Sequence, residues 1–258
     1  MKETRNLLNS LVACGVALAM VSTLAAQTAS QGSAKVVRLK GSARYAAGPN
    51  LGQLLKVGDI VRPGSVIQTA AGSRLDLALG DGSAPVAGSG AAASSATLSY
   101  APSAEQNIVR LWENTLLSID KLTVTQTGAD VVTETQLDLK AGHIFGMVKK
   151  MSAASKYEVK LPNGVAGIRG TVYDISAEGI VKVVSGSVVL AYVGPDGSVV
   201  TQVINGSQQF DARTGVLSTL PPAEGSEMKR YINELRAGFM PPAVPVSADM
   251  TLQYISPH

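Results

Sequence analysis

The strongest constraint on the fold is an alternation of apolar and polar residues with a period of two. It is clearest in the runs RLDLAL at 74–79, LDLK at 137–140 and YEVKL at 157–161. Successive side chains of a β-strand point to opposite faces, so each run predicts a strand with one buried and one solvated face. A surface helix would instead repeat its apolar residues three and four positions apart. The chain is therefore expected to be built mainly from strands.

Short turn sequences separate these runs. They are GDG at 80–82, PNG at 162–164, GPDG at 194–197 and NG at 205–206. Residues 188–204 carry one such turn in their middle and predict a β-hairpin. Short strands with frequent turns indicate an all-β domain, which we place at residues 34–220. We expect an irregular β-solenoid or β-sandwich, with a jelly roll as the alternative fold.

A glycine precedes a strand-like run at several places in a similar way. The copies are GSVI at 64–67, GHIF at 142–145 and GSVV at 186–189, with a more polar version after Gly206. Their irregular spacing excludes a strict short-period repeat but is compatible with a solenoid whose coils differ in length. The simpler interpretation, in which glycine merely ends turns, accounts for the same pattern.

Three segments depart from the strand pattern. Residues 82–104 consist mostly of small side chains that bury little apolar area, so they predict an exposed loop inserted into the domain. Residues 224–238 predict one amphipathic helix, because Met228, Tyr231, Ile232 and Leu235 fall on one face. The Pro-rich tail at 239–258 is expected to be extended.

The N-terminus has the order of a secretory signal peptide at residues 1–26. Lys2 and Arg5 precede an apolar run, and small residues follow before Gln27. An uncleaved membrane anchor is the alternative, but the run at 11–26 is shorter than the ~20 apolar residues that span a bilayer. Lipidation at Cys14 is a second alternative, but the apolar run continues past the cysteine, where the sequence of a lipoprotein usually turns polar. We expect an exported protein, periplasmic or secreted, without a stable membrane span.

Composition excludes several classes of site. The only cysteine is Cys14, so cleavage near Gln27 leaves no disulfide and no cysteine metal cluster. Of two histidines, His258 is terminal and only His143 is internal, and no Gly-x-Ser-x-Gly motif presents a nucleophile. Lys and Arg are scattered and aromatic residues make up only 4% of the chain, which argues against nucleic acid as a partner. We predict no enzyme, no catalytic residue, no metal and no cofactor.

The most distinctive stretch is LPNGVAGIRGTVYDI at 161–175. Gly164, Gly167 and Gly170 surround Arg169, and β-branched residues such as Thr171 follow. A second distinctive stretch is VGDIVRPGSVIQT at 57–69, which contains Asp59.

These stretches resemble the FecR-like domain, the periplasmic module of ferric-citrate-type signalling regulators. The resemblance covers residues 36–190 and rests on an ordered set of motifs: KGSA at 40–43, VGDI at 57–60, RLDL at 74–77, DGS at 81–83, LDLKAG at 137–142, LP at 161–162, GIRGT at 167–171 and VVSGSV at 183–188. In that family a cytoplasmic segment that handles a sigma factor and a transmembrane helix precede the domain. We expect this chain to lack both.

The candidate site residues are Arg169, Gly167, Gly170, Thr171 and Asp59, each either partner-binding or fold-determining. Arg169 can anchor an anionic ligand or a partner carboxylate through its rigid donor fork. We expect it instead to pair internally with Asp59, Asp81 or Asp174 and to determine the fold, because an arginine near apolar strands must be paired.

The resemblance implies a noncatalytic exported module that binds an envelope protein or a cell-surface glycan. One alternative function is an accessory that docks on a transmembrane signalling regulator through an exposed strand edge. Another is an envelope hydrolase with an unrecognised carboxylate pair.

Overall fold

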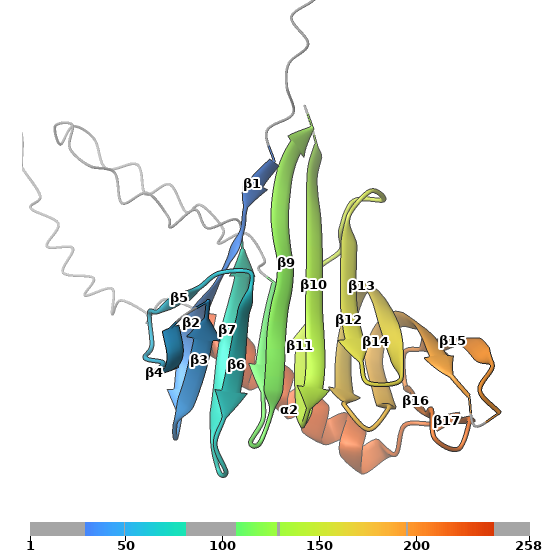
Figure 1. The fold of residues 1–258 in the computed structure, drawn as a ribbon. Coiled ribbons are helices and arrows are strands. Elements are labelled where there is room, and N and C mark those ends of the chain that lie inside the picture. The colour runs from blue at the N-terminus through green and yellow to red at the C-terminus, as the bar shows by residue number, and fades with distance from the viewer. Residues whose placement is uncertain (1–28, 49, 81–106, 128–129, 195, 240–258) are drawn as a thin grey trace, which may run out of the picture.

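The computed structural model describes residues 29–48, 50–80, 107–127, 130–194 and 196–239. These residues form strands β1 to β17 and one C-terminal helix, α2 (Figure 1). The all-β prediction with a single C-terminal helix is confirmed. The predicted signal peptide, the loop at 82–104 and the tail beyond Phe239 lie outside the described residues.

The strands form two sheets that lie face to face. The front sheet runs in the order β4 (Asn50–Leu54), β3 (Ala43–Ala47), β6 (Ser65–Thr69), β9 (Leu116–Thr127), β10 (Asp130–Ala141), β12 (Lys156–Leu161), β13 (Gly164–Ser176), β14 (Ile180–Val193) and β15 (Val199–Asn205). Strand β1 (Ala29–Gln31) pairs with the far end of β9. All of these pairs are antiparallel except β10 with β12.

The rear sheet starts at the same end of the molecule. Its order is β5 (Ile60–Val61), β2 (Ser33–Lys40), β7 (Arg74–Gly80), β8 (Asn107–Leu111), β11 (His143–Met147), β13, β14, β16 (Gln208–Asp211) and β17 (Val216–Thr219). Strands β13 and β14 therefore belong to both sheets. Residues 164–167 of β13 pair with β12 in front, and residues 172–176 pair with β11 behind. Within the described residues the ladders never return to their starting strand, so the sheet is curled but open.

The main core fills the space between the sheets. Val36, Leu77 and Ile144 enter it from the rear sheet, and Leu117 and Val159 enter it from the front sheet; all five are fully buried. Burial of each such side chain stabilises the fold by roughly 1.5–3 kcal/mol. The alternating runs read from the sequence therefore have their apolar members between the two sheets.

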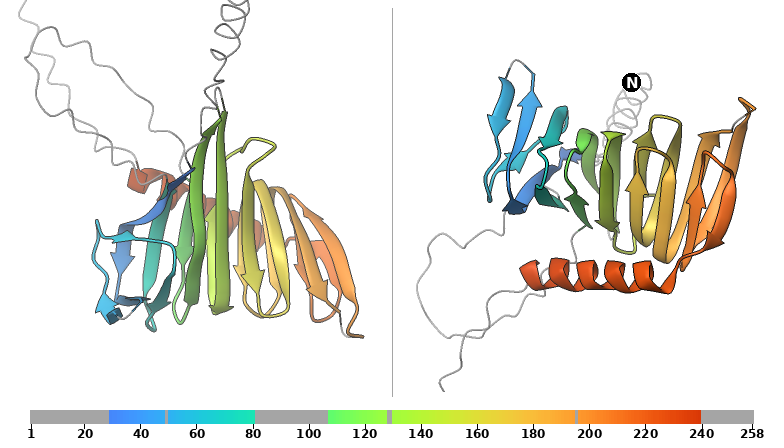
Figure 2. Two further views of the ribbon diagram at one scale, coloured as in Figure 1. Left: turned by 45° about the horizontal axis from the view of Figure 1, so that its top comes forward. Right: turned by 90° about the horizontal axis from the view of Figure 1, so that it is seen from below.

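Helix α2 (Pro222–Phe239) forms a third layer on the outside of the rear sheet (Figure 2). Met228 and Leu235 are buried there in a second, smaller cluster with Ile108 and Phe145 of the sheet. The predicted apolar face of the helix is thus the face that packs. In the described part of the chain, no helix is long and apolar enough to cross a membrane.

Glycine and a hydroxyl group recur where the chain passes between the sheets. Gly142 separates β10 in front from β11 behind, and Gly186 lies where β14 changes sheets; both have positive φ angles, of 78° and 84°. The hydroxyl of Thr115 accepts from the N–H of His143 at 3.1 Å, and that of Thr171 accepts from Ser187 at 3.2 Å.

A third corner of this kind joins β2 to β3. Gly41 has a φ angle of 77°, and the N–H of the following Ser42 donates to the hydroxyl of Ser73 at 2.9 Å. A Cβ on Gly41, Gly142 or Gly186 would lie within 2.5 Å of an oxygen atom of Ser73, Thr115 or Gly170, respectively. The glycine echo of the sequence therefore has a structural cause at Gly142 and Gly186, because only glycine fits such a corner.

Candidate functional site

The glycine-rich stretch around Arg169 lies in β13, where the strand leaves the front sheet. Arg169 points away from the core and is exposed. Among the described residues it makes no ion pair: the Asp59 carboxylate accepts from the N–H of Lys56 at 2.8 Å, and Asp174 contacts His143 at 2.8 Å. Internal pairing with Asp59 or Asp174 is therefore a wrong expectation, because Arg169 lies on the outer face of the front sheet. Asp81 lies outside the described residues.

Gly170 and Thr171 form the corner itself. Gly170 has a φ angle of 63°, and the ladder between β13 and β14 shifts register between Arg169 and Val172. The buried Thr171 hydroxyl donates to the carbonyl of Ser187 at 2.8 Å and accepts from its N–H at 3.2 Å. These contacts hold the two shared strands together at the point where they change sheets. They give Thr171 and Gly170 a structural task.

Gly167 has no such task. Its φ angle is not positive, and an added Cβ would meet only the carbonyl oxygen of Val189, at an ordinary 3.7 Å. A glycine in a strand costs about 0.5–1 kcal/mol relative to alanine. The backbone and the packing would both accept a larger residue at Gly167. The strip of outer surface without a side chain at this position is therefore not needed for folding.

Exposed valines surround this strip on β13, β14 and β15. Their exposed fractions range from 39% to 76%, and we call them the valine face: Val165, Val189, Val193, Val199 and Val203. Gly167 lies opposite Val189, which lies opposite Val203, so these three form one row across the strands. Arg169, Ser187 and Asn205 form a parallel polar row beside it. The site is thus an apolar face with one arginine at its border.

Strand β15 ends the front sheet at this side. Within the described residues it forms a ladder with β14 alone. At its other edge the carbonyl of Val203 accepts from the Gln202 side chain and the N–H of Asn205 donates to the Gln208 side chain, both at 2.7 Å, so the backbone without such partners is at residues 199–201. Its sequence, VVTQVIN, contains no charged residue and no proline. Lysine, proline and bulges are the usual protection of strand edges against added strands. This edge is therefore open to pairing.

The buried arginine of the fold is Arg110 in β8, not Arg169. Its guanidinium is fully buried and donates to both oxygens of Asp76, at 2.7 and 3.0 Å, and to Glu234 of α2 at 3.1 Å. Burial disfavours its charge, but Asp76 and Glu234 outweigh burial and raise the pKa of Arg110. In the sequence, Arg110 lies in the apolar run IVRL at 108–111. Arg169 lies in a similar context, GIRGT at 167–171, so the sequence alone does not distinguish the two. Arg110 fastens the helix to the rear sheet.

His143 also lies on the rear sheet, against the helix layer. Its Nε2 contacts Asp174 at 2.8 Å and Trp112 stacks on its ring at a centroid distance of 5.6 Å. In the described part of the chain, no group of three or more His, Cys, Asp or Glu residues could hold a metal. The histidine is accounted for by these neighbours.

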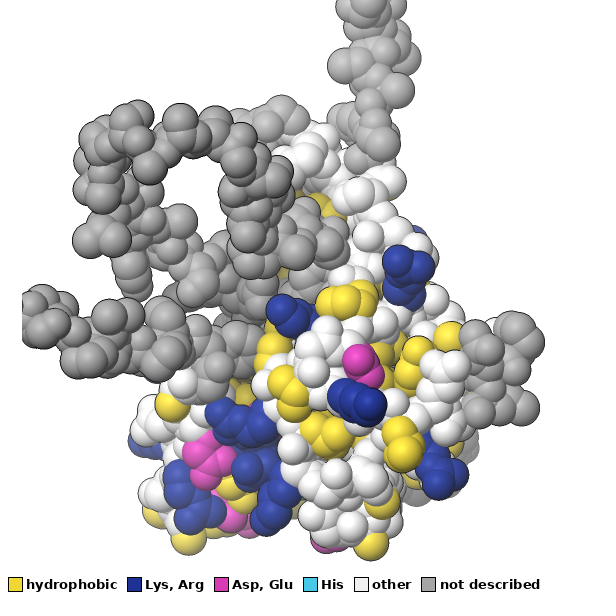
Figure 3. Space-filling model, turned by 90° about the vertical axis from the view of Figure 1, so that its left-hand side faces the viewer, with side chains coloured by type: hydrophobic (Ala, Val, Ile, Leu, Met, Phe, Trp, Pro, Cys, Tyr) yellow, Lys and Arg dark blue, Asp and Glu magenta, His cyan; other side chains and the backbone are white. Residues whose placement is uncertain are grey.

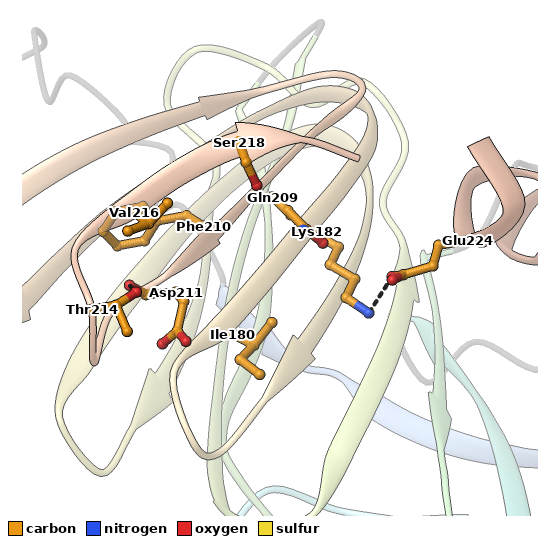
Figure 4. Close-up of a pocket in the computed structure, with 9 residues that line it drawn as sticks. All are labelled: Ile180, Lys182, Gln209, Phe210, Asp211, Thr214, Val216, Ser218 and Glu224. Carbon is orange, nitrogen blue, oxygen red and sulfur yellow. Dashed lines mark hydrogen bonds and ion pairs between the residues drawn. The ribbon is translucent and has the colours of Figure 1, made fainter. Parts of the chain in front are cut away.

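A surface pocket of about 450 Å³ lies between β14, β16, β17 and the start of α2 (Figure 4). Lys182 and Glu224 form an ion pair of 2.5 Å on one side, and Phe210 and Val216 line the other. The charged groups of Lys182 on β14 and Glu224 on α2 are thus already paired with each other. We assign no ligand to this pocket.

Comparisons with known proteins agree with the resemblance over part of the chain. Residues 89–189 match the family model described as FecR protein. FecR proteins are non-enzymatic signalling regulators, and their FecR domain is typically periplasmic. The motifs from LDLKAG to VVSGSV lie in the matched range, whereas KGSA, VGDI and RLDL lie before it. No curated protein matches the chain.

Two crystal structures of a candidate anti-sigma factor from Parabacteroides distasonis ATCC 8503 align with the fold. Each alignment has a TM-score of 0.32 and 14% sequence identity, and covers 43% of this chain. The aligned part spans about half of those chains, 49% in one and 50% in the other. A similarity at this level carries no argument about function. The similarity to FecR proteins therefore rests on the sequence match over residues 89–189.

Proposed function

We propose that this protein is an exported, noncatalytic FecR-like module that binds an extended segment of an envelope protein. The segment adds to the front sheet as a further strand beside β15, next to Val199 and Val203, and the partner chain beyond it lies over the rest of the valine face. In strand addition, backbone hydrogen bonds supply affinity and side-chain contacts supply specificity. The uncharged edge of β15, unpaired in the described residues at 199–201, is the observation that carries this proposal.

The chemistry of the face favours protein over glycan. Valine side chains cannot hydrogen-bond, so sugar hydroxyls pressed against them would lose their water without replacement, which is costly. The β-branched side chains of a partner strand fit such a surface well. Arg169, in the polar row beside the valines, offers its donor fork to a carboxylate of the same partner.

A signalling partner is the second candidate within this class. The FecR match favours it, because FecR proteins act in signalling. In that case the bound segment belongs to a transmembrane regulator of the ferric-citrate sensing type. The module itself performs no reaction and binds no cofactor.

The test is capture of partners from the native cell envelope with matched valine variants. Val203 on β15 and Val131 on β10 are 47% and 46% exposed, so they form a matched pair. Val203→Glu places a charge in the proposed contact, and Val131→Glu places the same charge elsewhere. We expect one stoichiometric protein with the wild type and with Val131→Glu, lost with Val203→Glu and weakened by Arg169→Ala.

Thermal unfolding of each variant checks that the fold is retained. Equal capture by both glutamate variants would show that β15 is not the site. Retention of polysaccharide without protein would assign the module to glycan binding instead.

A further inference from the structure

The end of the sandwich opposite to β15 combines exposed apolar and basic side chains. Leu54, Val57 and Ile60, at the end of β4, in the following turn and at the start of β5, are 60%, 61% and 49% exposed. Lys56 lies between the first two, and Lys35 on β2 lies directly opposite Ile60. Figures 1 and 2 show β4 and β5 at one end and β15 at the other.

The turn at 56–59 holds the apolar tips away from the core. The Asp59 carboxylate accepts from the N–H of Lys56 at 2.8 Å, and the N–H of Gly58 donates to the carbonyl of Val36 at 2.8 Å. Leu55 is buried just before the turn and anchors it. Since this turn is closed and tied to β2, Val57 cannot fold back into the core. Its exposure is a fixed property of the surface.

The charge of this region is one-sided. Residues 33–80 contain seven Lys or Arg and two Asp, an excess greater than the net charge of +3 of the whole chain. Both carboxylates are engaged, Asp59 in its turn and Asp76 with Arg110. Lys40 and Arg74 even lie directly opposite one another in the ladder, an arrangement that destabilises a sheet. Arg74 pairs with Glu234 at 3.3 Å and Arg38 with Asp76 at 3.8 Å, but the other five cations make no ion pair within the described residues, so stability of the fold does not explain them.

Figure 3 looks onto this end and shows Lys and Arg side chains interspersed with hydrophobic ones, with some Asp or Glu among them. The exposed basic residues here are Lys35, Lys40, Arg44, Lys56 and Arg62. We call this surface, together with Leu54, Val57 and Ile60, the basic end. It wraps from the outer face of the front sheet, where Leu54 pairs with Arg44, to that of the rear sheet.

We propose that the basic end is a docking surface for the anionic lipid headgroups of a membrane. Leu54, Val57 and Ile60 enter the boundary between headgroups and acyl chains, and the basic side chains meet the lipid phosphates. Peripheral binding of this kind depends on buried apolar area together with attraction to anionic lipid. Each cation near such a surface contributes about 1 kcal/mol, a factor of about five in affinity. The proposal is independent of the strand addition at β15, because the two surfaces lie at opposite ends and can be occupied together.

The test is co-sedimentation of the full chain with vesicles. One set contains phosphatidylglycerol and phosphatidylethanolamine in equal parts, and the other contains phosphatidylcholine alone. We expect binding to the anionic vesicles only, weakened by added salt because exposed charges are screened. Lys56→Glu should weaken binding about 30-fold, since it removes one attraction and adds one repulsion of about 1 kcal/mol each. Val57→Ser should weaken it at unchanged charge.

The matched controls are Lys229→Glu on α2 and Val199→Ser on β15, both exposed and outside the basic end. Each should bind like the wild type. Equal weakening by Lys56→Glu and Lys229→Glu would overturn the proposal, because binding would then depend on net charge alone. Binding that is unaffected by Val57→Ser, and matched by soluble dextran sulfate, would also overturn it and assign the surface to a dissolved polyanion. Failure here leaves capture at β15 unaffected, so the two proposals are tested separately.

Discussion

Replacement of Arg110 by methionine should destabilise the fold by about 3–4 kcal/mol. The substitution leaves the carboxylate of Asp76 buried, with 2% of its side chain exposed, and the nearest remaining cation is Arg38 at 3.8 Å. Removing one member of a buried ion pair typically costs about 3–5 kcal/mol, because the other charge is left uncompensated. Arg38 offsets part of this loss, which places the expectation toward the lower end. The pair with Glu234 adds about 1 kcal/mol or less, since that carboxylate is 36% exposed.

Urea unfolding measures the loss as a change in midpoint at constant slope. The control is the double variant Arg110→Met with Asp76→Leu, which removes both charges and fills the space with apolar atoms. We expect it to recover most of the lost stability, because a buried ion pair replaced by well-packed apolar residues is often neutral. A loss below about 1 kcal/mol for Arg110→Met, or a double variant as unstable as the sum of both changes, would refute the reasoning.

Three further predictions concern single residues. Gly186→Ala should lower the melting temperature markedly, since its φ angle is 84° and the new Cβ would lie 2.4 Å from the carbonyl oxygen of Gly170; Gly167→Ala should not lower it. Thr171→Val should cost about 1–3 kcal/mol in urea unfolding, because the N–H of Ser187 loses its acceptor. Burial raises the pKa of Asp120, but hydrogen bonds from Lys160 and Ser118 outweigh it and lower the pKa. The small contribution of Asp120 to the free energy of unfolding is therefore complete above about pH 4 and is lost as pH falls through the folded-state pKa. Asp120→Asn should remove this pH dependence of unfolding.

The period of the sequence was sufficient to predict the class of the fold. Alternation reports directly which face of a strand is buried, so the runs at 74–79 and 157–161 identified core residues such as Leu77 and Val159. Sequence could not show that β13 and β14 serve two sheets. That arrangement depends on the register shift between Arg169 and Val172, a property of pairing over distance.

The two arginines show the same limit at the level of a site. Arg110 and Arg169 both follow a β-branched residue in a strand, yet the first is buried and the second exposed. Only the neighbours across the sheet distinguish them, since Asp76 lies opposite Arg110 and Ser187 opposite Arg169. The valine face was missed for a related reason. Valine in a strand normally indicates a core position, but Val203 on β15 and Val189 on β14 both lie on the outer face of the front sheet, which makes them surface residues.

The sharing of β13 and β14 by both sheets has a mechanical consequence. The two sheets cannot separate at that side without bending both strands, and the bend is held by Thr171 and Gly186. At the opposite side the sheets are joined by turns, so the sandwich can spread there at lower cost. Amide hydrogen exchange should accordingly be slowest in β13 and β14 and faster in β3 and β5. The basic end, which is the more flexible end of the sandwich, would therefore contact the membrane, while the β15 edge is held by the more rigid strands β13 and β14.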